Sequence, residues 1–383
     1  MKSGLAPIVA LTCPSGLTMM PGMTTGPTSA TLEFDPARLD AFLRSALPGR
    51  TGGAMMLERI SGGQSNPTFF LSYPDAGTRL VLRKKPPGPL LPSAHAVERE
   101  YRILKALAGS AVPVPPVLLL HEQDDVVGTP FYLMERLEGR VFHDTALPGV
   151  SSDDRRAMYF AMAETLAALH AFDWQAAGLA DFGKPGNYYA RQLRRWGGQW
   201  RETKTRPIPA IDRAIDWLSA HLDESAETTI VHGDFRLGNL MFAPDAPRIV
   251  AVLDWELATL GHPLSDVAFS CLPWHSTPAM YAGFVGLDRA ALGIPTQAEY
   301  LERYCAAAGR ASGPGRFHIA FSLFRFAVIL DGIAARAKSG NAAAENAVAV
   351  GAMAESFALR ADAVINDKNS ETVQEKTRGT PLL

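Results

Sequence analysis

The spacing of apolar residues changes once along this chain, and that change restricts its fold more than any other feature does. Before residue 138, short apolar runs alternate with turn-forming residues, which predicts strands over residues 55–60, 68–73, 79–83, 117–120 and 131–135. Apolar residues at helical spacing predict one helix among these strands, over residues 94–107, and a short helix precedes them at 35–47. This part of the chain is therefore predicted to form a five-stranded antiparallel sheet that carries one helix.

After Glu138 and Gly139 the helical period dominates, and helices are expected over residues 153–172, 211–222 and 317–336. Two short apolar runs, 229–231 and 249–253, interrupt the helices and predict strands, each followed shortly by an acidic residue in a loop. The sequence thus predicts an α+β fold with an N-terminal antiparallel sheet lobe and a larger, mainly helical C-terminal lobe.

A length of 383 residues predicts two domains or one large two-lobed one. We expect a disordered leader over residues 1–34, because its apolar patch is cut by Pro7 and Pro14 and is too short for a signal peptide. The remaining boundaries place an N-terminal lobe at 35–136, a C-terminal lobe at 137–365 and a flexible tail at 366–383.

The charge and cysteine content exclude several classes of partner. Lys and Arg number 37 against 39 Asp and Glu, so no overall field attracts nucleic acid or an anionic membrane. The three cysteines form no CxxC pair, which argues against a disulfide framework or a thiolate zinc site and favours the cytoplasm. The most apolar stretch, 317–335, contains His318, Arg325 and Asp331 and predicts a buried helix, not a membrane span. The sequence does not specify an oligomeric state.

The residues most informative about chemistry are His-Gly-Asp-Phe-Arg-Leu-Gly-Asn at 232–239 and Leu-Asp-Trp at 253–255. Phosphoryl transfer needs a carboxylate to receive the hydroxyl proton and oxygen ligands for Mg²⁺. Asp234 and Asn239 lie five residues apart, and Asp254 ends the next strand. Protein kinases space their catalytic Asp and their Asn and Asp metal ligands in the same way.

With His-Gly-Asp in the first motif and Asp-Trp-Glu in the second, the chain resembles the aminoglycoside phosphotransferase superfamily, kinase-like enzymes that act on small-molecule hydroxyls. The strings Gly-Gly-Gln-Ser-Asn, Val-Leu-Arg-Lys-Lys-Pro-Pro-Gly and Leu-Asp-Trp-Glu-Leu-Ala-Thr-Leu-Gly are similar to the branch fused to some acyl-CoA dehydrogenases. That branch is associated with phosphorylation of hydroxy acids or their CoA thioesters. The resemblance covers roughly residues 57–337.

The resemblance implies a two-lobed protein-kinase-like fold that uses ATP and Mg²⁺. It makes Asp234 the catalytic base and Asn239 and Asp254 the Mg²⁺ ligands. His232 is expected to hold the loop by hydrogen bonds, and Asp266 to accept hydrogen bonds from the amides of the catalytic loop; both roles are structural.

The nucleotide side is expected in the sheet lobe. Kinases place a phosphate-covering flap between their first two strands, where this chain has Gly63, Gln64, Ser65 and Asn66. Kinases also use a cation on the third strand, paired with a helix Glu.

We favour Arg83 as the cation, since the apolar run of the strand ends there, and Lys85 on the same strand face is the competitor. Glu100 matches the helix Glu, whereas Glu98 points about 200° away around the helix and suits a solvent salt bridge. Backbone groups of Glu135 and Leu137, in the hinge over 131–137, are expected to contact adenine.

The acceptor is expected to be an anion, because residues 188–206 hold six cations and one acid. A solvated helix face is the alternative, although two Trp and two Tyr residues are unusual on one. The candidate acceptor-binding residues are Arg191, Arg194, Arg195 and Trp196. Arg236, inside the catalytic loop, is expected either to reach the acceptor or transferring phosphate, or to form a loop salt bridge.

These observations predict a kinase that transfers the ATP γ-phosphate to a hydroxyl of an anionic small molecule, first of all a hydroxy acid or hydroxyacyl-CoA. Phosphorylation of an aminoglycoside or of an amino alcohol is the alternative within enzymes. A nucleotide-binding pseudokinase is the alternative of another class, and the presence of Asp234, Asn239 and Asp254 counts against it. No nucleic acid or membrane partner is expected.

Overall fold

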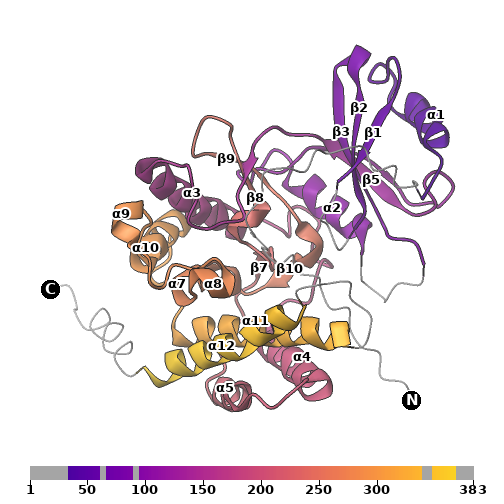
Figure 1. The fold of residues 1–383 in the computed structure, drawn as a ribbon. Helices are drawn as coiled ribbons and strands as arrows, with labels where there is room; N and C mark the ends of the chain where they lie inside the picture. The colour runs from indigo at the N-terminus through magenta and orange to yellow at the C-terminus, as the bar shows by residue number, and fades with distance from the viewer. Residues whose placement is uncertain (1–32, 61–65, 89–94, 339–346, 368–383) are drawn as a thin grey trace. The chain divides into compact units, whose positions relative to one another are not determined.

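The computed structural model describes residues 33–60, 66–88, 95–338 and 347–367. These residues form two compact units (Figure 1). The sheet unit comprises the described residues up to His143 together with Ala177–Leu179 and Gly238–Ala258. The helical unit comprises Asp144–Ala176, Ala180–Leu237 and the described residues from Thr259 onward.

The sheet unit is built on five antiparallel strands in the order β1-β2-β3-β5-β4. Their bounds are β1 Met56–Arg59, β2 Thr68–Tyr73, β3 Thr78–Lys84, β4 Val117–His121 and β5 Phe131–Glu135, with the 3-10 turn η1 at Pro74–Ala76. In β2 every second residue is buried, so Phe69, Leu71 and Tyr73 face the core. The predicted five-stranded antiparallel sheet is confirmed.

Two helices pack on this sheet. Helix α1 (Pro36–Ala46) is capped by the Asp35 side chain, and it buries Leu39 and Leu43 in the core that β2 and β3 line. Before it, Phe34 already packs edge-on against Phe69, with ring centroids 5.4 Å apart. Helix α2 (Val97–Leu107) buries a stripe of four apolar residues and, on the same stripe, Glu100.

A small second sheet in the same unit has the order β6-β8-β9, with β6 at Arg140–Val141, β8 at Leu240–Phe242 and β9 at Ile249–Val252. The 3-10 turns η2 (Leu237–Asn239) and η3 (Trp255–Leu257) flank the β8–β9 hairpin. Because β6 pairs with β8, residues 238–258 group with the sheet unit. The boundary at residue 137 assigned them to the C-terminal lobe, so the structure divides the chain differently there.

The described residues of the helical unit are mainly helical. Its elements are α3 Ser152–His170, α4 Tyr188–Thr203, α5 Pro209–Ala220, β7 Thr229–Val231, β10 Thr259–Gly261, α6 Leu264–Ser270, α7 Leu272–His275, α8 Pro278–Tyr281, α9 Arg289–Leu292, α10 Gln297–Ala308, α11 Arg316–Lys338 and α12 Ala347–Asn366. Strands β7 and β10 pair antiparallel as a two-stranded sheet.

Helix α11 packs beside α12 and also contacts α4, α5, α6 and α7 (Figure 1). By length and composition, Arg316–Arg336 could cross a membrane, but 89% of its most apolar window is buried inside the protein. Its acid Asp331 is buried and accepts hydrogen bonds from the Thr205 hydroxyl and backbone N–H, at 2.8 and 3.1 Å. This is how the core helix of a globular unit is packed.

Candidate active site

In the sheet unit, the Arg83 guanidinium gathers three carboxylates at the end of β3. Its Nε lies 3.0 Å from Glu100 Oε2, and its Nη2 lies 2.9 Å from Asp254 Oδ1 and 3.5 Å from Glu256 Oε2. The Arg83 side chain is only 15% exposed. Burial opposes the charged form, but Glu100 and Asp254 outweigh it and raise the pKa of Arg83, so the guanidinium stays charged.

Glu100 is buried and held from three sides. Besides the Arg83 ion pair, it accepts hydrogen bonds from the Asn66 amide at 2.7 Å and the Tyr132 hydroxyl at 3.1 Å. Burial raises the pKa of Glu100, while Arg83 and these two donors oppose the increase. Asn66 is therefore a support of the Glu100 carboxylate, and its Oδ1 also lies 3.0 Å from His95 Nδ1.

The second cation and acid form a separate pair. Lys85 Nζ lies 2.9 Å from Glu98 Oε2, and the Glu98 side chain is 41% exposed. The structure thus joins Arg83 to Glu100 in the interior and Lys85 to Glu98 at the surface. The flap residues Gly63, Gln64 and Ser65 lie outside the described residues.

The hairpin of β8 and β9 brings Asn239 and Asp254 to the same end of a small sheet. Leu240 pairs with Val252, and the Leu253 N–H donates to the Asn239 carbonyl at 2.8 Å, which extends the ladder by one step. Asp254 follows in the left-handed region, with φ 64° and ψ 64°, a conformation that Asp adopts more readily than most residues.

Both residues carry oxygen donors, the ligand type that suits Mg²⁺. Asp254 Oδ1 accepts from Arg83, whereas its Oδ2 has no hydrogen-bond partner among the described residues. Asn239 is buried at the start of the hairpin. The donor set therefore fits a hard divalent cation.

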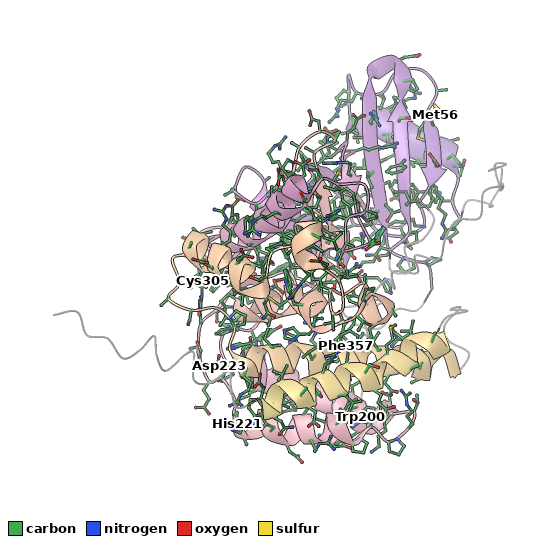
Figure 2. All side chains as sticks on the ribbon, turned by 60° about the vertical axis from the view of Figure 1, so that its left-hand side comes forward. Met56, Trp200, His221, Asp223, Cys305 and Phe357 are labelled. Carbon is green, nitrogen blue, oxygen red and sulfur yellow. The ribbon has the colours of Figure 1, made fainter. Side chains whose placement is uncertain are left out.

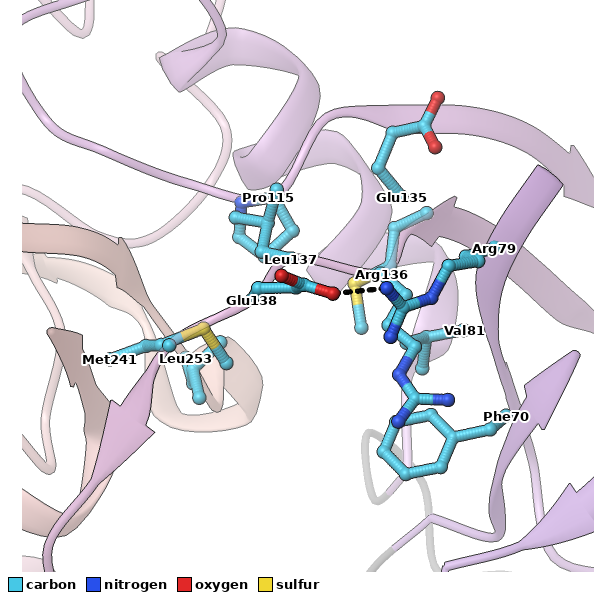
Figure 3. A pocket seen from close by; sticks show the side chains of 12 residues that line it. Phe70, Arg79, Val81, Pro115, Glu135, Arg136, Leu137, Glu138, Met241 and Leu253 are labelled. Atoms are coloured by element: carbon cyan, nitrogen blue, oxygen red, sulfur yellow. Dashed lines mark hydrogen bonds and ion pairs between the residues drawn. The ribbon is translucent and has the colours of Figure 1, made fainter. Parts of the chain in front are cut away.

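Beside this cluster, in the same unit, a pocket of about 340 Å³ opens against the hinge. Phe70 and Val81 line one side and Met241 and Leu253 the other (Figure 3). The hinge and its neighbours complete the lining, with Arg79, Pro115, Met134, Glu135, Arg136, Leu137, Glu138 and Gly139. Apolar walls facing each other across a strip of backbone suit a flat aromatic base.

The backbone and side chains of the hinge have different roles. Glu135 sends its side chain away from the pocket, to an ion pair with Arg50 at 2.7 Å (Figure 3). The Leu137 N–H donates to no backbone carbonyl among the described residues, so a ligand acceptor could use it. Glu138 pairs with Arg79 across the pocket edge.

In the helical unit, Asp266 shapes the loop that follows β7. Its carboxylate accepts from the backbone N–H of His232 at 2.5 Å and of Gly233 at 2.9 Å. His232 Nδ1 in turn accepts from the Asp234 N–H at 3.2 Å. Gly233 has φ +83°, where a Cβ would be strained, and its carbonyl accepts from Arg325 Nη2 at 2.8 Å.

This loop presents Asp234 to a guanidinium. The Asp234 side chain is 7% exposed, and its Oδ2 accepts from Arg236 Nε at 3.1 Å. The structure thus places the two residues predicted to be catalytic in direct contact.

The cations of residues 188–206 do not act alike. Arg191 donates to the carbonyls of Gly186 and Lys184 and fastens the start of α4. Arg206 donates to the Gly351 carbonyl at 2.9 Å and lies 3.5 Å from Asp331.

Arg194 and Arg195 are exposed, whereas Trp196 is buried. The carbon centre of the Arg195 guanidinium lies 5.0 Å from the Trp196 ring centroid, and that of Arg325 lies 5.6 Å from it. Arg325 was missed by sequence reasoning, although a cation within a helix predicted to be buried was the available signal.

A further cluster in the helical unit has the composition of a metal site. Asp223, labelled in Figure 2, follows α5 in the sequence. One ligand atom each of Asp223, His262 and His318 lies within 4.8 Å of the others. However, His262 Nδ1 and His318 Nδ1 both accept backbone N–H groups, at 3.3 and 3.1 Å. Because each Nδ1 accepts a hydrogen bond, Nε2 carries the proton in both rings; Nε2 is the atom that faces Asp223, and the cluster does not fit a metal.

Comparison with known proteins identifies relatives over most of the chain. The model of the phosphotransferase enzyme family matches residues 57–318. Acyl-CoA dehydrogenase family member 10 of Mus musculus is 46% identical over 337 residues, which are 87% of this chain and 31% of that protein. The chain thus spans less than half the length of the curated relatives it matches.

Two solved structures share the fold. A "putative aminoglycoside phosphotransferase" from Ralstonia eutropha is 45% identical, with a TM-score of 0.79 over 87% of this chain and 98% of that one. Aminoglycoside 2′-phosphotransferase-IIIa, solved as a GDP complex, is 14% identical, with a TM-score of 0.57 over 84% of this chain and 98% of that one. At that identity the second likeness concerns the fold alone.

Proposed function

This chain belongs to the phosphotransferase enzyme family, and on that premise we propose that it transfers the γ-phosphate of ATP to a hydroxyl of an anionic small molecule. The family resemblance and the kinase-like α+β fold that the sequence motifs indicate are both confirmed. The observation that carries the proposal is the cluster of Arg83, Glu100 and Asp254 beside the hinge pocket.

The hinge pocket takes the adenine ring between its apolar walls, with the Leu137 N–H as a donor. Arg83, oriented by Glu100, binds the α- and β-phosphates through its planar fork of donors. Asn239 and Asp254 would hold Mg²⁺, which would neutralise negative charge on the nucleotide phosphates. A nucleotide complex of a protein with this fold supports a nucleotide site.

The residue that takes part in proton transfer lies in the loop after β7. Asp234 accepts the proton of the acceptor hydroxyl as that oxygen bonds to the γ-phosphorus, and the bond from phosphorus to the β-phosphate oxygen breaks to release ADP. Arg236 donates to the Asp234 carboxylate and fixes its orientation. Asp266 keeps the loop in shape through two backbone amides.

The acceptor is a hydroxy acid or hydroxyacyl-CoA in this proposal. The exposed Arg194 and Arg195 and the nearby Arg325 present positive charge in the helical unit that holds Asp234. These positive groups would repel a polycationic aminoglycoside. Such a substrate is bound by sites lined with carboxylates.

The test measures ADP release from the purified protein with Mg-ATP and a panel of hydroxy acids, their CoA esters, choline and kanamycin. Asp234→Asn, which keeps the shape of the side chain, should lower turnover about 10²- to 10⁴-fold while the protein stays folded by circular dichroism. Turnover of kanamycin alone would overturn the anionic acceptor. Nucleotide binding without any turnover by the wild type would favour a pseudokinase.

A further inference from the structure

Helices α4 and α11 pack together, and each carries nitrogen donors toward the other. A Cβ on Gly332 of α11 would lie 3.0 Å from Gln199 Nε2 and 3.6 Å from Arg336 Nη1, so both donors reach this glycine. Gln199 lies one turn after Arg195 on α4, and Arg325 lies two turns before Gly332 on α11. The facing surfaces of the two helices are therefore rich in donors.

Trp196 connects the two arginines of this surface. Both the Arg195 and the Arg325 guanidinium lie within 6 Å of its ring, at 5.0 and 5.6 Å from the centroid. Arg195 is exposed as a whole residue, but its guanidinium is partly desolvated, and this together with the positive charge of Arg325 lowers the pKa of Arg195. The two like charges therefore repel each other. An anion between them would convert this repulsion into attraction.

Two donors here are buried without an acceptor. Gln199 Nε2 and Arg325 Nε have no hydrogen-bond partner among the described residues. Leaving a buried donor unsatisfied costs free energy, so these atoms are prepared for an acceptor group that the described residues do not supply. The nearby acid of α11, Asp331, is already engaged by Thr205.

Arg325 also contacts the catalytic loop, through another of its nitrogen atoms. Arg325 Nη2 donates to the Gly233 carbonyl at 2.8 Å, directly before Asp234. A group bound by Arg325 is therefore held beside the residue that accepts the hydroxyl proton in the proposed reaction.

We propose that Arg195, Gln199 and Arg325 form a binding subsite for the anionic group of the acceptor, a carboxylate or a phosphate. This inference rests on the proposed function and adds to it the residues that select the acceptor. Arg325 and Arg195 bind the anion oxygens, Gln199 donates a third hydrogen bond, and Trp196 supports the guanidinium groups.

The experiment compares Arg325→Gln, Arg195→Gln and Arg325→Lys with Arg201→Gln, an exposed arginine on the same helix as the matched control. With the best hydroxy acid of the panel, Arg325→Gln and Arg195→Gln should each raise the acceptor KM about tenfold or more, while KM for ATP changes less than twofold. Arg325→Lys should recover part of the loss, and Arg201→Gln should behave as the wild type.

A binding measurement keeps this inference separate from the proposed function. Calorimetry with a carboxylic acid that lacks the hydroxyl should show affinity that Arg325→Gln weakens tenfold or more. A wild type that binds this acid through Arg325 but turns over no hydroxy acid would sink the proposed function and leave the subsite standing. Unchanged acid affinity in Arg325→Gln and Arg195→Gln, or a fall in kcat at constant acceptor KM, would overturn the subsite and leave Arg325 as a support of the loop.

Two modified acceptors, each lacking one anionic group, distinguish the source of the anion. If the carboxylate occupies the subsite, the methyl ester of the hydroxy acid should be a poor substrate for the wild type and equally poor for Arg325→Gln. If a CoA phosphate occupies it, the dephospho-CoA ester should show that loss instead. An equal effect of Arg325→Gln on the methyl ester and on both charged acceptors contradicts anion binding.

Discussion

A single side chain, Arg83, decides how charge is arranged in the sheet unit, because three carboxylates converge on it. Its pairing with the helix acid was predictable because the apolar run of the strand ends at Arg83, although alternation alone leaves Lys85 on the same face. Its partner was predictable as well, because Glu98 and Glu100 point to different sides of α2. The contacts to Asp254 and Glu256, more than 170 residues away, were not readable from local spacing.

Arg83→Met should damage both stability and nucleotide binding, since it leaves Glu100 buried without a counter-charge. We expect a loss of about 3–5 kcal/mol in the free energy of unfolding, measured by urea titration, and a large rise in KM for ATP. Lys85→Met is the matched control, because it breaks a surface pair worth about 0–1 kcal/mol. If Lys85→Met raised KM for ATP more than Arg83→Met did, Lys85 would be the phosphate-binding cation.

At the scale of elements, the sequence was most informative where the apolar pattern is strong and local. Strands 68–73, 131–135 and 229–231 agree with the structure to the residue. Helix α10 was missed, although Thr296 and Glu299 form a capping box that marks its start. Helix α12 was missed because it is apolar with little contrast between its faces, and its boundaries depend on packing against α11.

The close approach of β6 to β8 gives the hinge pocket one of its walls. A Cβ on Gly139 would collide with the Met241 side chain and lie 2.6 Å from the Phe242 carbonyl. Gly139→Ala should therefore displace the hinge, raise KM for ATP and cost about 1–3 kcal/mol of stability. Gly198→Ala is the control, because a Cβ there meets no atom within 4 Å and helix propensity favours Ala. Normal ATP kinetics in Gly139→Ala would show that the hinge absorbs the methyl group without moving.

At the scale of the whole molecule, the parts of the site that sequence could not supply are contacts between distant segments. The motif residues Asp234, Asn239 and Asp254 lie within 21 positions of one another, so their pattern survives in the sequence. The contact of Arg325 with Gly233 joins residues 92 positions apart, and that of His318 with Asp223 spans 95. No periodicity connects such residues, because only the packing of helices brings them together.

The cluster of His262, His318 and Asp223 predicts that the stability of the folded chain depends on pH. Burial, aided by the charge of His318, lowers the pKa of His262 to about 4, against an ordinary value near 6.5, although Asp223 and Glu227 oppose the shift. Between these values the unfolded chain binds the proton and the folded chain does not, so stability falls as pH falls, by about 1.4 kcal/mol per unit. Asp223 does not obscure the effect, because its own pKa is lowered to about 2.

Urea titrations at pH 7 and pH 5 measure this contribution. His262→Asn keeps an acceptor for the Leu264 N–H and cannot titrate, so it should lose about 2 kcal/mol less than the wild type between the two pH values. His221→Asn is the control, because His221, labelled in Figure 2, is exposed and stacks on Trp217, and it should lose as much as the wild type. An equal loss in His262→Asn and the wild type would mean that other groups carry the acid sensitivity, such as the partly buried His275, whose pKa is also lowered by burial.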